Sequence, residues 1–455
     1  MNQTLKNPMT KIPKPAGNAG FTLVELMIAL AISLIAMIGI VSLFSGTSRS
    51  NKLQEGLARL QENGRFAATR MEEDLRMAGA QYCSDYTGNR HVGPVAPMWQ
   101  DRAPFVFASN LNLQDSGGMQ SVDSAGNRST GAATAPYGLS SRFFMQGYTC
   151  TTGTTCTPAL PVTSMFPAAG LVAGNRVPNT DILTIRYLRG SGWPILPVVD
   201  TPANRDCLSG QIVTLAPQAG DPPVNFVSGQ LALISDCGSP SILPISSAAG
   251  NVLTIGSRLP SIFAPICKSK GQRDIRVFNF TTDFVTVTYY LAFRANDNPD
   301  ARINGGGARL VPTLIRRENG VEQELVRGVD RLDFRYGVRD RGGNMRFLTA
   351  AQVDSRLGNT IVCPPKPDGV DPSPNNPAAS ELGCLWRSVR RIEAYMLVNS
   401  GDEVPALDAI GRSYRYMGTL ITPLETTAVT AGGVLTHSYP RREFIAHATH
   451  RNKTP

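Results

Sequence analysis

An unbroken apolar run near the N-terminus constrains this chain more than any other feature of its sequence. Residues 21–45 read FTLVELMIALAISLIAMIGIVSLFS and contain one charged side chain, Glu25. At a rise of ~1.5 Å per residue, a helix of this length covers roughly 37 Å, and the hydrocarbon core of a bilayer is ~30 Å thick. The run is therefore predicted to be a transmembrane helix.

The residues before the run predict its orientation. Lys6, Lys11 and Lys14 lie in residues 1–20 without any acidic neighbour. Because positive charge beside a span favours the cytoplasmic side, the N-terminus is expected to stay in the cytoplasm and the rest of the chain to lie outside.

Glu25 does not fit an ordinary anchor. A carboxylate costs roughly 2.5 to 3.5 kcal/mol at the centre of a spanning helix, and somewhat less near its end. A cleaved secretory signal is the first alternative, but the segment after the run, 43–47 (LFSGT), is a poor match to a small-x-small cleavage site. An ordinary signal anchor is the second alternative, and an acid there would bring only a cost.

The segment around residue 20 resembles the prepilin signature. A basic leader ends in Gly20, the aromatic Phe21 follows, and Glu25 stands four positions later at the head of the apolar run. The resemblance implies that a prepilin peptidase cuts after Gly20 and methylates the new amine of Phe21. The leader, residues 1–20, is longer than most in the family, and Met9 is an alternative start that would shorten it.

Cleavage at this point would give Glu25 a role. The new ammonium group of Phe21 in one subunit can neutralise the carboxylate of Glu25 in a neighbour, since other polar partners are scarce among apolar helices. Such a pair penalises misaligned packing of helices that are otherwise featureless. Glu25 is therefore expected to set the assembly register.

The helix is predicted to continue beyond the apolar run to about residue 79, where Gly79 is a stop signal. Apolar or small residues recur at spacings of three and four between charged ones. The simplest interpretation is a face that packs on a globular domain, and a coiled-coil contact with another subunit is the alternative. The stripe comprises Leu53, Leu57, Leu60, Gly64, Ala67, Met71, Leu75 and Ala78, and the charged residues between them include Glu72 and Asp74.

Eight cysteines favour structural disulfides in an oxidising compartment, the periplasm. Their number is even, none forms a C-x-x-C pair, and they lie in loop-rich sequence. Proximity alone suggests pairing 150 with 156, 207 with 237 and 363 with 384, which leaves 83 with 267. The candidates are Cys83, Cys150, Cys156, Cys207, Cys237, Cys267, Cys363 and Cys384.

The rest of the chain predicts a β-rich head. Only 17% of the residues are charged, and 43 glycines and 33 prolines suit a loop-rich β protein. Residues 81–180 lack periodicity and are expected to be loops and insertions. Strand signals at 181–187, 212–215, 231–234, 252–255 and 284–293, and alternating apolar residues at 331–336 and 391–398, predict a mostly antiparallel sheet with a hairpin at Asn319-Gly320.

The C-terminal residues resemble the sheet region of PilW-type minor pilins. The similarity rests on YYL at 289–291, LIRR at 314–317, ELVRGVDRLDFRYG at 324–337, Trp386 with VRRI at 389–392, and Arg451-Asn452. It extends over roughly 21–80 and 280–455. A Pro- and Asn-rich insertion, residues 357–384, departs from the pattern after an expected short helix, residues 348–355.

The two resemblances together imply an α+β, type IV pilin-like fold: a long N-terminal helix packed on a mostly antiparallel sheet with large loop insertions. The expected segments are a leader (1–20), a membrane half of the helix (21–45), an amphipathic half (46–80), an insertion-rich, cysteine-containing β region (81–280) and a C-terminal sheet region (281–455).

The function implied is a non-catalytic minor pilin that helps to initiate type IV pilus assembly near the tip. Its expected partners are prepilin peptidase, other minor pilins, the major pilin, the inner-membrane assembly platform and the inner membrane itself. It would have a periplasmic head before assembly and lie in the extracellular pilus afterwards. The alternatives are pseudopilin J of a type II secretion system, usually much smaller, and a tip adhesin or DNA-capturing pilin that binds through residues 81–280.

Nothing in the sequence indicates catalysis, a cofactor or a metal. No nucleophile-elbow, P-loop or zincin motif occurs. The pair His447 and His450 lacks neighbouring ligands, and the polar segment 296–307 lacks the acidic residues of a calcium loop. The net charge of +9, nearer +6 without the three leader lysines, suits a basic extracytoplasmic protein, and the scattered arginines at 390–391, 441–442 and 451 do not identify a nucleic-acid surface.

Overall fold

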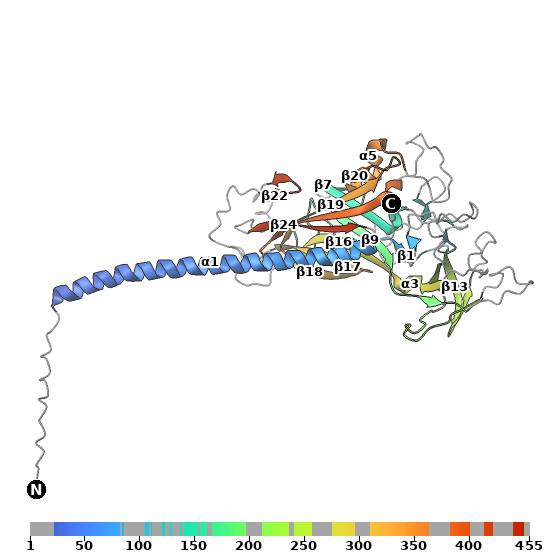
Figure 1. Ribbon diagram of the computed structural model, residues 1–455, viewed down its shortest axis with the longest axis horizontal. Coiled ribbons are helices and arrows are strands. Elements are labelled where there is room, and N and C mark those ends of the chain that lie inside the picture. Colours follow the sequence, from blue (N-terminus) through green and yellow to red (C-terminus); the bar gives the residue numbers. More distant parts are fainter. Residues whose placement is uncertain are drawn as a thin grey trace, which may run out of the picture. The chain divides into compact units, whose positions relative to one another are not determined.

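The fold is described by a computed structural model, whose elements run from helix α1 to strand β24 (Figure 1). The structure describes residues 22–81, 84–85, 105–108, 111, 121–122, 128–129, 137–138, 141–152, 155–161, 166–196, 212–235, 241–256, 275–295, 310–363, 383–400, 414–421 and 440–449. The chain divides into two compact units, Met1–Glu55 and Gly56–Pro455.

Helix α1 (Leu23–Met77) confirms the long N-terminal helix. It ends where Gly79 adopts a φ of 75°, a left-handed conformation that glycine enters without steric cost. The N–H of Gly79 then donates to the carbonyl of Arg186 at 2.8 Å, which ties the end of the helix to the head.

The part of α1 within the second unit buries the predicted stripe from Leu60 onwards. Gly64 is required there, because the ring of Phe444 occupies the space that a Cβ would need. Two residues differ from the prediction: Leu57 is 40% exposed, and Asp74, assigned to the charged face, is buried. Asp74 lies at the margin of the stripe, where side chains of the head neutralise it. The buried members of the stripe are Leu60, Gly64, Ala67, Met71, Leu75 and Ala78.

The first sheet of the head has six antiparallel strands. The predicted Asn-Gly hairpin is confirmed in it, with φ of 47° at Asn319 and 89° at Gly320. In spatial order the strands are β18 (Val321–Arg327), β17 (Leu310–Glu318), β16 (Phe284–Ala295), β9 (Ile182–Leu188), β7 (Met145–Thr152) and β8 (Thr155–Thr157).

A second sheet of four antiparallel strands packs with the first around a common core. That core holds apolar side chains of α1, of β9 and β16, and of all four strands of the second sheet. In spatial order the strands of the second sheet are β20 (Met345–Leu348), β19 (Val329–Arg339), β21 (Val389–Asn399) and β24 (Arg441–Thr449).

A third sheet closes into a small barrel with its own apolar interior. The row of strands closes because Ile195 bridges to Leu215, and the N–H of Ala216 donates to the carbonyl of Pro194 at 2.7 Å. In spatial order the strands of this row are β10 (Trp193–Pro194), β15 (Arg276–Asn279), β12 (Leu231–Ser235), β13 (Ser241–Ala249), β14 (Val252–Ile255) and β11 (Ile212–Thr214). Two further strands branch from it: β3 (Phe105–Val106) pairs with β13, and β6 (Tyr137–Gly138) pairs with β3.

The barrel is an insertion between two paired strands of the first sheet (Figure 1). Leu188 at the end of β9 pairs with Phe284 at the start of β16, and the N–H of Arg189 donates to the carbonyl of Asp283 at 2.8 Å. The chain therefore leaves and re-enters the head at adjacent points.

Short elements complete the described part of the chain. Among the described strands, β3 and β13 form the one parallel pair. The predicted short helix near residue 350 is α4, which Thr349 and Gln352 cap reciprocally. The short elements are β1 (Ala80–Gln81), β2 (Ser84–Asp85), β3 (Phe105–Val106), β4 (Ser121–Val122), β5 (Arg128–Ser129), β6 (Tyr137–Gly138), β22 (Tyr414–Tyr416), β23 (Thr419–Ile421), α2 (Ser141–Phe144), α3 (Phe280–Asp283), α4 (Ala350–Asp354), α5 (Arg356–Asn359) and the 3₁₀ helix η4 (Cys384–Ser388).

The expectation of loops throughout 81–180 is wrong at β7. Met145, Tyr148 and Cys150 are all buried, so this strand is covered on both faces and shows none of the alternation that marks a half-buried strand. Gly147 lies against the Tyr336 hydroxyl, which fills the space of a side chain. The first sheet thus takes strands from both sides of residue 280.

Candidate functional site

The N-terminal end of α1 carries a capping box that holds Glu25. The Glu25 carboxylate accepts hydrogen bonds from the N–H of Thr22 at 3.1 Å and from its hydroxyl at 3.0 Å. In return, the N–H of Glu25 donates to the Thr22 hydroxyl at 3.3 Å. Within a single chain the carboxylate therefore already has a partner, which the sequence pattern Thr-x-x-Glu before an apolar run could have predicted. Gly20 and Phe21 lie outside the described residues.

The first unit exposes its apolar side chains along the helix. Within the described residues, α1 is the helix long and apolar enough to cross a membrane, and its apolar stretch is not buried. Leu23 and Phe44, at the two ends of the run, are 75% and 78% exposed. Such a surface requires lipid or other apolar helices around it.

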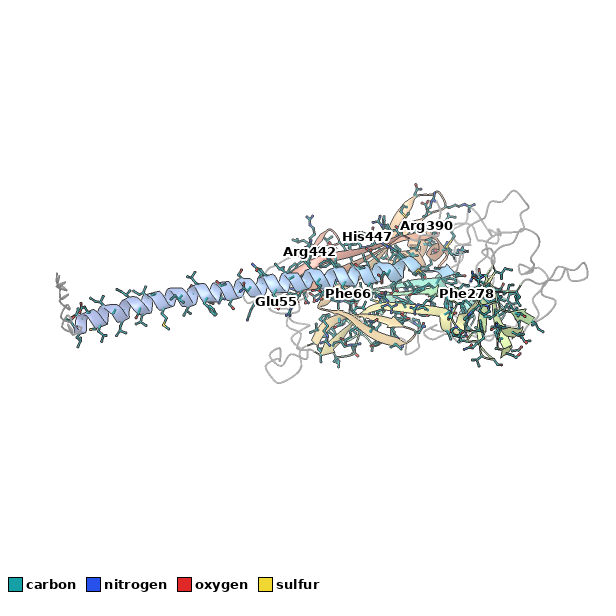
Figure 2. All side chains as sticks on the ribbon, turned by 60° about the horizontal axis from the view of Figure 1, so that its bottom comes forward. Glu55, Phe66, Phe278, Arg390, Arg442 and His447 are labelled. Atoms are coloured by element: carbon teal, nitrogen blue, oxygen red, sulfur yellow. A yellow bond between two sulfur atoms is a disulfide. The ribbon has the colours of Figure 1, made fainter. Side chains whose placement is uncertain are left out.

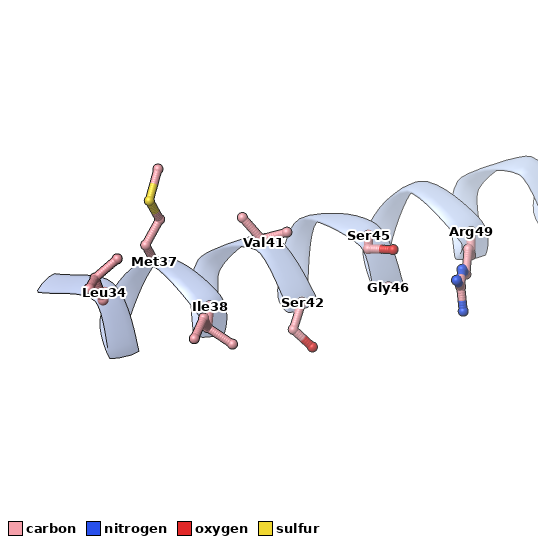
Figure 3. A pocket seen from close by; sticks show the side chains of 8 residues that line it. All are labelled: Leu34, Met37, Ile38, Val41, Ser42, Ser45, Gly46 and Arg49. Atoms are coloured by element: carbon pink, nitrogen blue, oxygen red, sulfur yellow. The ribbon is translucent and has the colours of Figure 1, made fainter. Parts of the chain in front are cut away.

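Small residues leave a shallow hollow along one side of this helix (Figure 3). A Cβ at Gly46 would have nothing within 4 Å of it. Because small side chains let backbones approach closely, the hollow suits the packing of a second helix better than the binding of a small ligand. Its lining residues are Leu34, Met37, Ile38, Val41, Ser42, Ser45, Gly46 and Arg49.

Asp74 is the centre of a buried polar cluster that joins α1 to the first sheet. Its carboxylate accepts from Tyr289 at 2.5 Å, from Tyr187 at 3.0 Å, and from Arg316 Nε and Nη2 at 2.6 and 3.2 Å. Burial alone would raise the pKa of Asp74, but the hydrogen bonds from Arg316 and Tyr289 outweigh it and hold that pKa below its usual value. Arg316 also pairs with Glu318 at 2.6 Å.

A second buried carboxylate, Asp181, ties the first sheet to the second. Its two oxygens accept from the N–H of Cys150 on β7 and from the N–H of Phe334 on β19, each at 3.1 Å. Burial, with the nearby charge of Asp333 as the next cause, raises the pKa of Asp181 to about 7. The contact between the sheets therefore contains a group that titrates near neutrality.

Titration of Asp181 predicts a loss of stability between pH 5 and 8. A carboxyl whose pKa is raised in the fold stabilises the fold below its unfolded pKa, and this contribution is lost as pH rises through about 7. The side chain of Asp181→Asn does not titrate, so the unfolding free energy of this variant should not show that loss. The difference in unfolding free energy, variant minus wild type, should therefore rise by about 2 kcal/mol from pH 5 to pH 8. Urea unfolding of the protein in detergent, followed by the fluorescence of buried Trp386, measures this difference. Asp340→Asn, in an exposed turn, is the matched control, and parallel pH curves for Asp181→Asn and wild type would contradict the assignment.

Two of the disulfides suggested by proximity are present in the described residues. Cys150 is bonded to Cys156, which links β7 to β8, and Cys363 is bonded to Cys384 across the insertion before η4. The remaining candidates, Cys83, Cys207, Cys237 and Cys267, lie outside the described part.

The weaker candidates for metal binding are not assembled into a site within the part of the chain that the structure describes. His447 lies on β24 with its Nδ1 3.2 Å from Arg391 Nη2, whereas His450 and residues 296–307 fall outside that part. Among the described residues, no group of three or more His, Cys, Asp or Glu side chains could hold a metal ion.

Comparison with known proteins adds two matched regions and one relative. Residues 296–452 match the family described as type IV pilus-assembly protein W, and residues 16–41 match the prokaryotic N-terminal methylation motif. The chain is 27% identical over 184 residues to the pilin-like protein PilA3 of Thermus thermophilus, and the match covers 38% of this chain and 76% of the relative. No solved structure matches the chain.

Proposed function

We propose that this chain, which matches the type IV pilus-assembly protein W family over residues 296–452 and the N-terminal methylation motif over residues 16–41, is a minor pilin of a type IV pilus that helps to initiate assembly near the tip. The observation that carries the proposal is the coincidence of the methylation motif, residues 16–41, with an exposed apolar helix that begins at Leu23. The role is structural, and its partners are the major pilin, other minor pilins and the inner-membrane assembly platform.

In this proposal, prepilin peptidase cleaves the precursor after Gly20 and methylates Phe21. The apolar half of α1, residues 21–45, then anchors the subunit in the inner membrane with its head in the periplasm. The exposed leucine, isoleucine and methionine side chains of this segment support the anchor, and the hollow at Gly46 supports its later packing against other pilin helices. Extraction into the filament exchanges lipid contacts for helix contacts.

Glu25 sets the register during that exchange. In the single chain its carboxylate is held by Thr22, and incorporation offers it a stronger partner, the ammonium group of a neighbouring Phe21. A charge pair of this kind contributes little net stability, but it penalises every other alignment of the apolar helices.

A pilus subunit is favoured over pseudopilin J of a secretion system, which shares the precursor chemistry. The match to the pilus-assembly family covers residues 296–452, which include β17 to β24, and so comprises the whole second sheet. The length of 455 residues also exceeds that of a usual pseudopilin.

Processing gives the direct test of the proposed function. Protein from a host with prepilin peptidase should begin at methylated Phe21, because Gly20 offers the peptidase a backbone without a side chain. Intact-mass and N-terminal peptide mass spectrometry measure this, with protein from a peptidase-deficient host as the control. An intact leader in the peptidase-containing host, or a cut near residue 45, would contradict the proposal.

A further inference from the structure

One part of the second sheet presents arginines around an exposed aromatic ring. On the face of the sheet away from the core, Phe347 of β20 pairs across Gly337 of β19 with Arg391 of β21. Phe347 is 46% exposed, and the guanidinium carbon of Arg391 lies 5.9 Å from the centre of its ring. Met345, 48% exposed, lies beside them opposite Arg339.

Gly337 allows this cluster to form. A Cβ at this position would lie 3.1 Å from the Cβ of Arg391, 3.2 Å from the sulfur of Met345 and 3.3 Å from the ring of Phe347. Because Gly337 has no side chain, the side chains of Arg391, Met345 and Phe347 can approach one another above β19. They therefore form a continuous surface across β20, β19 and β21.

This surface has a surplus of positive charge. Glu393 pairs with Arg391 at 3.0 Å, lies 3.7 Å from His447 and stands opposite Arg335 in the sheet, so one carboxylate faces three arginines. Arg335 and Arg339 form no ion pair with any residue that the structure describes. His447 of β24 lies next to Arg391 in the same sheet, with its Nδ1 3.2 Å from Arg391 Nη2. The guanidinium groups thus remain able to accept an anionic partner.

The other part of the same face is already covered by the short hairpin of β22 and β23. Tyr416 donates to Asp333 at 2.7 Å, and Arg331 lies over its ring at 5.6 Å. Six side chains around Glu393 lie outside this covered part and are here called the arginine–phenylalanine face: Arg335, Arg339, Arg391, His447, Met345 and Phe347.

We propose that the arginine–phenylalanine face binds single-stranded nucleic acid, with a base stacked on Phe347 and the backbone phosphates beside Arg335 and Arg339. An antiparallel sheet with an exposed aromatic ring and flanking arginines is suited to unpaired bases, because each base has a free π-face. A duplex hides those faces and offers only its phosphates. Arginine serves better than lysine here, because its planar fork matches phosphate and stacks on rings.

The test uses the full chain in a nonionic detergent and a fluorescein-labelled oligothymidylate of about twelve nucleotides. Fluorescence anisotropy should show binding that weakens with salt. Phe347→Ala should reduce the affinity about fivefold or more, whereas Phe347→Tyr should retain it. Phe66→Ala, which removes an exposed ring on α1 (Figure 2), is the matched control and should leave the affinity unchanged.

The arginines have a separate readout. Replacing Arg335 and Arg339 together by alanine should reduce the slope of log affinity against log salt by about 1.4, since each phosphate contact on a single strand contributes about 0.7. The control replaces Arg65 on α1 and Arg327 on β18, two arginines outside the face. Unchanged melting temperatures of all variants show that the fold is retained.

Three results would overturn the proposal. One is the absence of binding up to about 100 μM protein at low salt. Another is equal binding by wild type and Phe347→Ala, or a preference for duplex. The third is tighter binding of labelled polyglutamate than of the oligonucleotide at equal charge, which would make this face a docking surface for an acidic protein. None of these results bears on cleavage at Gly20, so the proposed function is tested independently.

Discussion

Replacing Asp74 by alanine should lower the free energy of unfolding of the head by about 3 to 5 kcal/mol. The reason is the group that remains: Arg316 has only 3% of its side chain exposed, would lose two hydrogen bonds to an ionised partner, and would keep Glu318 as its counter-charge. The hydroxyl groups of Tyr187 and Tyr289 would lose their acceptor at the same time. Urea unfolding followed by the fluorescence of Trp386 measures the effect.

Glu73→Ala provides the matched control for Asp74→Ala. Glu73 is the preceding residue of the same helix, but its side chain is 58% exposed and pairs with the partly exposed Arg70, so its loss should cost less than about 1 kcal/mol. A similar small change for Asp74→Ala would show that the buried cluster does not hold α1 on the head.

The effect of Asp74 should also depend on pH in a defined direction. Because its pKa is lowered in the fold, the stability that it contributes is present above its unfolded pKa and is lost as pH falls through the folded value. The difference between wild type and Asp74→Ala should therefore shrink only in strongly acidic solution. This sign is opposite to that of Asp181, so the two carboxylates can be distinguished in one series of measurements.

Replacing Glu25 by leucine should improve retention in the membrane and damage pilus assembly. The variant removes a charge from an apolar helix, which favours insertion. Within the filament it leaves the ammonium group of a neighbouring Phe21 without a partner, at a cost of about 3 kcal/mol or more, equivalent to a loss of roughly a hundredfold in incorporation. Membrane fractionation and counts of surface pili, in a strain with only the variant copy, measure the two effects.

Glu25→Gln separates the charge from the cap. Glutamine at this position can still accept a hydrogen bond from the N–H of Thr22, so the capping box and the start of α1 are retained. If the register depends on the charge, Glu25→Gln should assemble as poorly as Glu25→Leu. Normal piliation and incorporation of the leucine variant would show that Glu25 has no part in assembly.

Local sequence patterns were sufficient for much of the fold. The spacing of apolar residues predicted a helix to about residue 79, and α1 ends at Met77. The tight turn at Asn319-Gly320 and the alternation along β19 predicted strands that the structure contains. These features depend on neighbours a few residues apart, so a single window of sequence contains the information.

The sequence failed where a residue is buried by partners far along the chain. Asp74 looks like a solvent-facing charge, but Tyr187, Tyr289 and Arg316 reach it from 113, 215 and 242 residues away. Strand β7 lacks alternation because both of its faces are covered. Local periodicity identifies an apolar face, and it contains no information about a polar group whose partner comes from another strand.

The sequence by itself determined that this chain has a capped apolar helix with a methylation motif, because helix period, hydropathy and the Thr22–Glu25 pattern are properties of adjacent residues. Only the tertiary structure decided which charges are buried, that the segment between Leu188 and Phe284 closes into a barrel, and that Arg335, Arg339 and Arg391 gather around Phe347. The physical reason is that strand pairing brings together residues separated by tens to hundreds of positions. Their chemistry emerges only when the register of the sheets is set.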